Sequence, residues 1–399
     1  MLVGVDEAAA VAHSRDMELS VNIEARSAPP VRTLSDAERR DWLRLSRSEN
    51  VGPITFFRLI ERFGSAAAAL DALPGLARRG GRRTTLALCP PADAEREIEA
   101  TTAAGARLVA CREPAYPQAL AAIPDPPPLI AVKGDPALLA QPAVAVVGAR
   151  NASALGLRFA RDMAAELGRR GLVVVSGLAR GIDAAAHEGA LATGTVAVLG
   201  GGIDVVYPPE HETLYERIAE RGALIAETPA GTEPRARHFP RRNRLISGLS
   251  LGVLVVEAAP RSGSLITARM ALEQGREVFA VPGSPLDPRA RGPNGLIRQG
   301  AVLTETADDV VAALAPMAPI APDPLAEPRP EGFAPPEASE SEIADGRALV
   351  AERLGPAPVA VDELVRQTHL TPAALLTILL EFELAGRLVR HPGNKVSAA

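Results

Sequence analysis

A short arginine-rich segment is the strongest candidate for chemistry in this sequence. Residues 235–244 contain five arginines, and with Glu233 just before them the local charge is +4, although the whole chain carries −5. The planar guanidinium of arginine suits phosphate, and Phe239 inside the segment is a side chain on which a nucleobase can stack. The segment therefore predicts phosphate binding beside base stacking. An ordinary solvated charged surface is the open alternative.

Glycine-containing loops follow three apolar runs of the chain. Gly148–Ser153 follows the first, Ser176–Asp183 the second and Gly200–Gly202 the third. Glycine lets the chain turn sharply and brings backbone amides close to a phosphate, and Arg150 and Arg180 would add positive charge. Three such loops at successive strand ends predict a row of anion sites. Taken alone, the first loop is equally compatible with a plain strand-to-helix turn.

A fourth strand end also carries small polar residues. Ser262, Gly263 and Ser264 open a predicted helix, where hydroxyls and free amides suit an anion, although a plain N-cap would explain one serine. Asp183 and His187 lie four residues apart on another predicted helix. They could form an acid-base pair or metal ligands, but a solvent-facing pair is the simpler interpretation because no further ligand cluster accompanies them. We therefore expect no metal and no cofactor.

The elements that would position these loops are strands that alternate with amphipathic segments. Six apolar, mostly β-branched runs end at residues 147, 176, 199, 227, 257 and 281. Each run is apolar on both faces, as expected when helices cover both sides of a sheet. The pattern predicts an α/β fold with a doubly wound, mostly parallel Rossmann-like sheet, which binds ligands at the carboxyl ends of its strands.

Smaller regions flank the predicted sheet. The expected organisation is a mobile tail at 1–33, a helical domain of helix-hairpin-helix or sterile-alpha-motif type at 34–105, the Rossmann-like domain at 106–315, a Pro-rich linker at 316–342 and a winged-helix domain at 343–399. The second helix of the winged-helix pattern, capped by Thr371 with Pro372 at its first position, contains no Arg or Lys. A helix that reads the major groove normally presents such groups, so we expect this helix to contact protein or to be vestigial.

Composition excludes several classes of protein. Cys89 and Cys111 are the only cysteines, too few for a disulfide framework or a four-cysteine zinc site. No stretch approaches the roughly 20 apolar residues of a membrane span, and the first residues do not resemble a signal peptide. We expect a soluble cytoplasmic protein of two or three domains.

The loops occur within motifs that resemble the DprA/Smf family, whose name stands for DNA-processing protein A. In order from Tyr116 to about Ala301 the motifs are VGARNAS, SGLARGIDAAAH, LGGGIDVVYPPEH, HFPRRNRLISGLS, EAAPRSGSLITA and VPG followed by GPNGLIRQGA. The resemblance implies binding of single-stranded DNA, loading of the RecA recombinase onto that DNA in natural transformation or recombination, and homodimerisation through the Rossmann-like domain. It implies no catalytic step.

The motifs of this family and the glycine loops together give one set of residues that we expect to bind DNA. It comprises Gly148, Arg150, Ser153, Ser176, Gly177, Arg180, Gly181, Phe239, Arg241, Arg242, Asn243, Arg244, Ser262, Gly263, Ser264 and Thr267. Phe239 would stack a base, and the other members would line the pocket or hold phosphates.

Enzymes on related sheets are the alternative. Nucleoside-monophosphate phosphoribohydrolases carry a PGGxGTxxE stretch, and the comparable segment here, PRSGSLIT from Pro260, lacks the glutamate needed for acid-base work. A dinucleotide site is disfavoured because Arg150 and Ser153 stand where GxGxxG needs its second and third glycines. A P-loop ATPase is disfavoured because GxxxxGK[ST] is absent. The phosphoribohydrolase-like enzyme remains the alternative to a DNA-binding protein.

Overall fold

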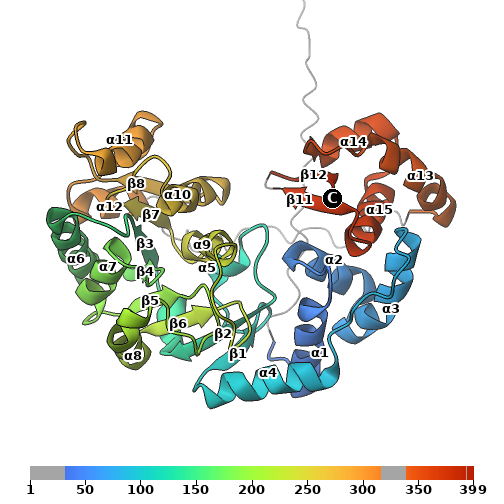
Figure 1. The fold of residues 1–399 in the computed structure, drawn as a ribbon, viewed down its shortest axis with the longest axis horizontal. Coiled ribbons are helices and arrows are strands. Elements are labelled where there is room, and N and C mark those ends of the chain that lie inside the picture. Colours follow the sequence, from blue (N-terminus) through green and yellow to red (C-terminus); the bar gives the residue numbers. More distant parts are fainter. Residues whose placement is uncertain (1–31, 316–337, 392) are drawn as a thin grey trace, which may run out of the picture.

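The computed structural model of the chain describes residues 32–315, 338–391 and 393–399. The expected tail at 1–33 lies almost wholly outside these residues, and the expected linker at 316–342 lies mostly outside them. A helical region comes first, a large sheet with helices on both faces follows, and a small three-stranded sheet with three helices ends the chain (Figure 1).

Nine strands form the large sheet, in the order β1-β2-β6-β5-β4-β3-β7-β8-β9. Their bounds are β1 Arg107–Ala110, β2 Leu129–Gly134, β3 Ala143–Val147, β4 Val173–Ser176, β5 Thr195–Val198, β6 Ala223–Ala226, β7 Gly252–Val255, β8 Glu277–Ala280 and β9 Val302–Leu303. The seven strands β3 to β9 are parallel to one another. Strands β1 and β2 extend the sheet beyond β6 in antiparallel pairing. The predicted Rossmann-like fold is confirmed.

The order of the parallel strands reverses at β3. From β3 the chain adds β4, β5 and β6 on one side, and it later adds β7, β8 and β9 on the other. The helices that follow β3 and β7 therefore cover opposite faces of the sheet and leave a crevice between them. In open α/β sheets ligands bind in such a crevice, outside the carboxyl ends of the strands.

Helices cover both faces of this sheet (Figure 1). Val144 and Val146 of β3 pack with α6 and α7 on one face, and Ala145 and Val147 pack toward α9 and α10 on the other. The helices of this region are α5 Gln118–Ala121, α6 Ala154–Arg169, α7 Ile182–Ala190, α8 Glu212–Arg221, α9 His238–Gly248, α10 Gly263–Glu273, α11 Arg291–Arg298 and α12 Ala307–Leu314, with short 3-10 turns at Pro136–Ala140, Pro209–His211 and Pro288–Ala290. Strands apolar on both faces are thus buried as predicted.

Four helices make the N-terminal region: α1 Asp36–Arg47, α2 Pro53–Phe63, α3 Ala66–Arg79 and α4 Pro91–Ala103. Ser35 caps α1 in a capping box with Glu38, which fixes the start of this helix. Trp42 of α1 meets Phe56 of α2 edge to face at 5.0 Å between ring centroids. This contact lies in an apolar cluster that also takes in Ala110 of β1 and Leu129 of β2, so the core of the helical region continues onto the edge of the sheet.

The C-terminal region has the winged-helix arrangement that the sequence predicts. Its helices are α13 Glu340–Arg353, α14 Val361–Thr368 and α15 Pro372–Leu384, and its strands pair in the order β10 Val359–Ala360, β12 Lys395–Ala398, β11 Leu388–His391. The Thr371 hydroxyl accepts a hydrogen bond from the Ala374 amide at 3.3 Å, which caps α15 as expected. No helix within the described ranges is long and apolar enough to cross a membrane.

Helix α15 packs against the N-terminal helices of the same chain (Figure 1). Leu380 and Leu384 of α15 join the apolar cluster of α1 to α3. Between them Glu381 is 1% exposed and forms ion pairs with Arg79 of α3 at 2.9 Å and Arg347 of α13 at 2.7 Å. The helix that would read DNA in a winged-helix domain is therefore engaged in a protein contact within its own chain.

Candidate functional site

Two adjoining cavities open at the carboxyl ends of the parallel strands. The first, which we call the strand-end pocket, has a volume of about 750 Å³ and lies beside the loops after β3 and β7. The second, the tyrosine pocket, has a volume of about 390 Å³ and lies beside the loops after β4 and β5. Both are lined by Arg150, Asn151, Ala179, Phe239 and Arg242. Residues from four strand ends and α9 thus meet at one edge of the sheet.

Most of the expected residues line these two cavities. The strand-end pocket takes in Gly148, Arg150, Phe239, Arg242, Asn243, Ser262, Gly263, Ser264 and Thr267, and the tyrosine pocket adds Gly177 and Arg180. The loops come together because parallel strands end at the same edge. The structure places Ser153, Ser176, Gly181, Arg241 and Arg244 outside both linings.

Positive charge in the strand-end pocket comes from Arg150 and Arg261. Both are exposed, and neither forms an ion pair with any residue that the structure describes. The Arg150 guanidinium lies 5.1 Å from the centroid of the Phe239 ring, within the range of a cation-π contact. Arg289 at the rim differs, because it pairs with Asp287 at 2.9 Å. Two guanidiniums are thus free to bind an anion beside an aromatic ring.

Arg242 lies beneath this edge rather than on it. It is 6% exposed, and its Nη1 donates to the carbonyl oxygens of Gly177, at 2.5 Å, and of Val198. Burial lowers the pKa of its guanidinium to about 10. Its Nε has no hydrogen-bond partner among the described residues. Arg242 therefore ties together the ends of β4 and β5, and its expected role in DNA binding stays a prediction.

The loop after β4 depends on this arginine. A Cβ at Gly177 would lie 2.2 Å from the Arg242 guanidinium, so only glycine fits there. The Asp183 carboxylate accepts hydrogen bonds from the amides of Gly177 at 3.1 Å and Ala179 at 3.4 Å, while burial raises its pKa. The Gly177 amide is therefore already engaged, and this glycine shapes the loop.

Ser153 and Ser176 are both hydrogen-bonded within the protein and line neither cavity, and their expected contact with phosphate stays a prediction. Ser153 caps α6, and both its amide, at 2.9 Å, and its hydroxyl donate to the Glu257 carboxylate. A carboxylate thus occupies the start of α6, where an anion would bind. Ser176 is fully buried, and its hydroxyl donates to the carbonyl oxygen of Val146 at 2.6 Å.

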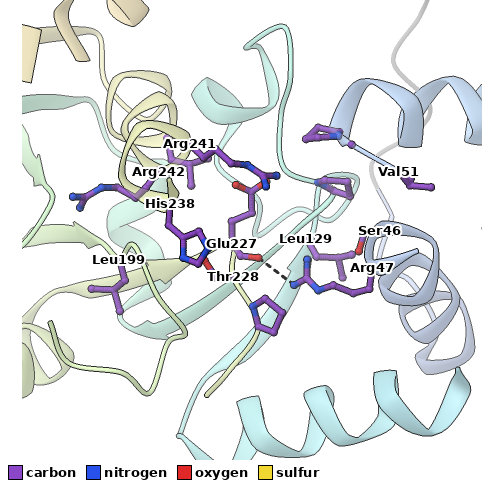
Figure 2. Close-up of a pocket in the computed structure, with 15 residues that line it drawn as sticks. Ser46, Arg47, Val51, Leu129, Leu199, Glu227, Thr228, His238, Arg241 and Arg242 are labelled. Carbon is purple, nitrogen blue, oxygen red and sulfur yellow. Dashed lines mark hydrogen bonds between the residues drawn. The ribbon is translucent and has the colours of Figure 1, made fainter. Parts of the chain in front are cut away.

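The arginine segment divides between the surface and the interior of α9. Arg241 is exposed and lines a separate cavity of about 140 Å³ between the sheet domain and α1. Figure 2 shows Arg241 on one wall and Arg47 on the other, where Arg47 donates to the carbonyl oxygen of Glu227 at 3.1 Å. Arg244 is 7% exposed and pairs with the Glu227 carboxylate at 2.5 Å. Arg244 is therefore a structural residue, which corrects its expected place in the pocket.

The remaining expected residues have local roles that the structure defines. Gly181 adopts a φ of +78°, and a Cβ there would lie 2.2 Å from the Ala149 carbonyl oxygen, so it shapes the loop. Arg180 lines the tyrosine pocket and pairs with Glu210. Asn243 donates to the Gly263 carbonyl oxygen at 3.3 Å. The Ser262 hydroxyl, which caps α10, lies 2.6 Å from that of Ser264.

Asp183 and His187 do not form the expected solvent-facing pair. Both are buried, and Nδ1 of His187 lies 2.8 Å from the Thr195 hydroxyl. Burial, with a further contribution from Arg242, lowers the pKa of His187 to about 3. No group of three or more His, Cys, Asp or Glu side chains within the described residues is arranged to hold a metal. Asp183 lines the strand-end pocket, whereas His187 lines neither cavity and lies in the core.

The expected set omitted several residues of the linings, among them Asn151, Tyr207 and Arg261. Arg261 stands immediately before the N-cap Ser262, so a cation at a strand end was a usable signal. Tyr207 follows the third glycine loop by five residues, and its spacing alone does not place it near Phe239.

The fold and site define a three-part protein in which a Rossmann-like sheet presents an arginine and aromatic pocket at its strand ends. Three family models match in the same order: "DNA recombination-mediator protein A" over residues 107–315, "DprA-like N-terminal HHH domain" over 36–100 and "DprA winged helix domain" over 334–394. The chain belongs to the DprA/Smf family.

Individual relatives agree with this assignment. The chain is 41% identical to Protein Smf of Escherichia coli over 284 residues, which cover 70% of this chain and 74% of the relative. It is 48% identical to DNA processing protein DprA of Bacillus subtilis over 198 residues, covering 49% of this chain and 67% of the relative. Among solved structures, DprA from Streptococcus pneumoniae superposes with a TM-score of 0.58 at 36% identity, covering 68% of this chain and 95% of that one.

Proposed function

We propose that this protein binds single-stranded DNA in the cytoplasm through the strand-end pocket and delivers it to the RecA recombinase, without catalysing a reaction. The observation that carries the proposal is the exposed Arg150 guanidinium beside the Phe239 ring, at the point where the strand order reverses. A cation that holds phosphate next to an aromatic ring that stacks a base is the usual arrangement for single-strand binding. Bases paired in a duplex cannot reach such a ring, so single strands are favoured.

The carboxylates of the strand-end pocket support a binding role over an enzymatic one. Asp183 accepts two loop amides, and Asp287 pairs with Arg289 at 2.9 Å. Neither is free to act as a general acid or base in this arrangement. Release of a free base from a nucleotide by the purified protein would instead support the phosphoribohydrolase-like alternative.

Transfer of DNA to RecA, a role in natural transformation and homodimerisation rest on family membership. Each of these parts is tested by its own measurement. Sedimentation would give the oligomeric state. Assembly of RecA on single-stranded DNA already coated with a single-strand-binding protein, with and without this protein, would test the loading role.

The binding site is tested by replacing Arg150. A fluorescence titration with labelled oligothymidylate over a salt series should show that Arg150→Ala weakens binding at least tenfold, a loss of about 1.5 kcal/mol. The slope of log affinity against log salt should fall by about 0.7, the value for one phosphate contact on a single strand. Arg158→Ala is the matched control, because Arg158 is an exposed arginine of α6 outside both cavities, paired with Asp162 at 3.5 Å.

Two results would contradict the proposed function. One is unchanged affinity and salt slope in Arg150→Ala. The other is a wild-type protein that binds duplex DNA as tightly as single-stranded DNA of the same sequence.

A further inference from the structure

We propose that Phe239 separates two base subsites and that Tyr207 provides the stacking surface of the second. Two consecutive bases of one strand would then lie on opposite sides of the Phe239 ring, one in the strand-end pocket and one in the tyrosine pocket. This inference rests on the proposed single-strand binding. It specifies that the site binds two adjacent, unpaired bases and holds them apart.

Five residues line both cavities and so form a shared wall: Arg150, Asn151, Ala179, Phe239 and Arg242. The tyrosine pocket, at about 390 Å³, falls within the range of roughly 300–1,000 Å³ that is typical of small-molecule sites. Each cavity is therefore large enough for a nucleobase. A strand that enters both must pass over the shared wall, where Arg150 is placed to hold the phosphate between the two bases.

Tyr207 offers an accessible aromatic surface in the second cavity. Its side chain is 43% exposed, and its hydroxyl makes no hydrogen bond to a residue in the described part of the chain. A tyrosine that served only as packing would normally be more buried and have a partner for its hydroxyl. An exposed ring beside arginine is instead the arrangement on which bases stack.

The geometry of the two rings fixes where the second base lies. The centroids of Tyr207 and Phe239 are 5.6 Å apart and their planes are inclined by 40°, so the rings already touch. No base can insert between them. The second base therefore stacks on the free side of Tyr207, away from Phe239, and the two rings act together as a wedge.

Glycines keep the space beside this wedge open. A Cβ at Gly200 would lie 3.1 Å from the Phe239 ring, and one at Gly201 would lie 2.7 Å from the Thr232 carbonyl oxygen. The loop after β5 thus approaches the ring with backbone alone. Since no side chain of this loop fills the tyrosine pocket there, its volume remains available to a base.

The test pairs variants of Tyr207 with two kinds of oligonucleotide, one continuous oligothymidylate and one in which every second nucleotide is abasic. On the continuous strand Tyr207→Ala should weaken binding about fivefold or more, the usual effect of removing one stacked base. Tyr207→Phe, which keeps the ring, should bind within twofold of wild type. The salt slope should not change, because no phosphate contact is lost.

The alternating strand separates stacking from a structural role. It can fill only one of the two subsites, so wild type should bind it more weakly than the continuous strand, and Tyr207→Ala should cause little further loss. Equal losses on both strands would mean that Tyr207 merely supports Phe239, and would overturn the inference. So would unchanged binding by Tyr207→Ala on the continuous strand. Failure of wild type to bind either strand would instead overturn the proposed function itself.

Discussion

The strand-end pocket and the contact of α15 with the N-terminal helices both rely on arginine, but in opposite ways. In the pocket, Arg150 and Arg261 have no carboxylate partner among the described residues. At α15, Arg79 and Arg347 share the carboxylate of Glu381, which is 1% exposed. An unpaired guanidinium at a surface can bind phosphate, whereas one paired with a buried carboxylate is committed to the fold.

This difference shows that the number of arginines in a segment does not locate a binding surface. Within α9 itself, Arg241 is exposed while Arg242 and Arg244 are buried and hydrogen-bonded to the protein. The winged-helix domain, which commonly binds DNA in other proteins, uses its α15 for an internal contact instead. What distinguishes the two regions is whether each cation already has a partner.

The largest effect should come from removing a paired arginine beneath the pocket. Arg244→Ala leaves the Glu227 carboxylate and the Asp125 carbonyl oxygen without their donors in a buried setting. We expect the free energy of unfolding of the sheet domain to fall by about 3 kcal/mol. Arg241→Ala, three positions earlier on the exposed side of α9, should change it by less than about 0.5 kcal/mol. Chemical denaturation followed by circular dichroism measures both.

The affinity of the Arg244→Ala variant for single-stranded DNA completes this first test. Properly folded Arg244→Ala should retain most of its affinity, since Arg244 lines neither cavity. If it keeps its stability and loses affinity as strongly as Arg150→Ala, then a paired arginine is also a binding arginine, and the distinction drawn between the two regions is wrong.

The sequence predicted the parallel strands of the sheet better than the antiparallel strands at its edge. The six apolar runs correspond to β3 through β8, because buried parallel strands need β-branched residues on both faces. Strand β2 follows a run of prolines and is not among the six predicted runs, although Leu129–Gly134 pairs with both β1 and β6. A short antiparallel extension has no signal of its own, because its pairing is decided by the neighbouring β6.

The site was predicted in outline but not in depth. Glycine loops and Phe239 converge as expected, because parallel strands bring their ends together. The run of arginines could not reveal which side of α9 faces the interior. It therefore did not distinguish the buried Arg242 and Arg244 from the exposed Arg241. Nor could spacing show that Glu257 would occupy the start of α6 by binding Ser153.

Acid should weaken the sheet domain through the buried His187. Burial lowers the pKa of this histidine from its ordinary value of 6.5 to about 3. The unfolded chain therefore binds a proton before the folded one, so the stability is fully present above about pH 6.5 and is lost progressively as the pH falls toward 3. Each pH unit in this window costs about 1.4 kcal/mol, or about 2 kcal/mol at pH 5.

Variants at two histidines isolate this effect. Thermal unfolding at pH 7 and pH 5 should show a smaller pH dependence in His187→Leu than in wild type, even if the variant is less stable at both. His369→Asn is the control, because His369 is exposed on the winged-helix domain and asparagine tolerates its φ of 56°. Identical pH dependence in His187→Leu and wild type would show that His187 does not make the sheet domain acid-sensitive.

The smallest effect should come from loosening the α15 contact. Glu381→Gln keeps the shape of the side chain but removes the charge shared by Arg79 and Arg347. Both arginines are partly exposed and can regain water, so we expect a loss of only about 1 kcal/mol. Faster amide hydrogen exchange in α3 and α15 would report it. Glu363→Gln is the control, since Glu363 forms a surface pair with Arg366 on α14.

The binding measurement on Glu381→Gln decides whether the two regions are independent. Since neither cavity at the strand ends is lined by a residue of α15, affinity for single-stranded DNA should stay within twofold of wild type. A tenfold loss, comparable to that expected of Arg150→Ala, would mean that the seating of the winged-helix domain shapes the pocket. The paired arginines would then contribute to binding indirectly, through the fold, and the two regions would not be independent.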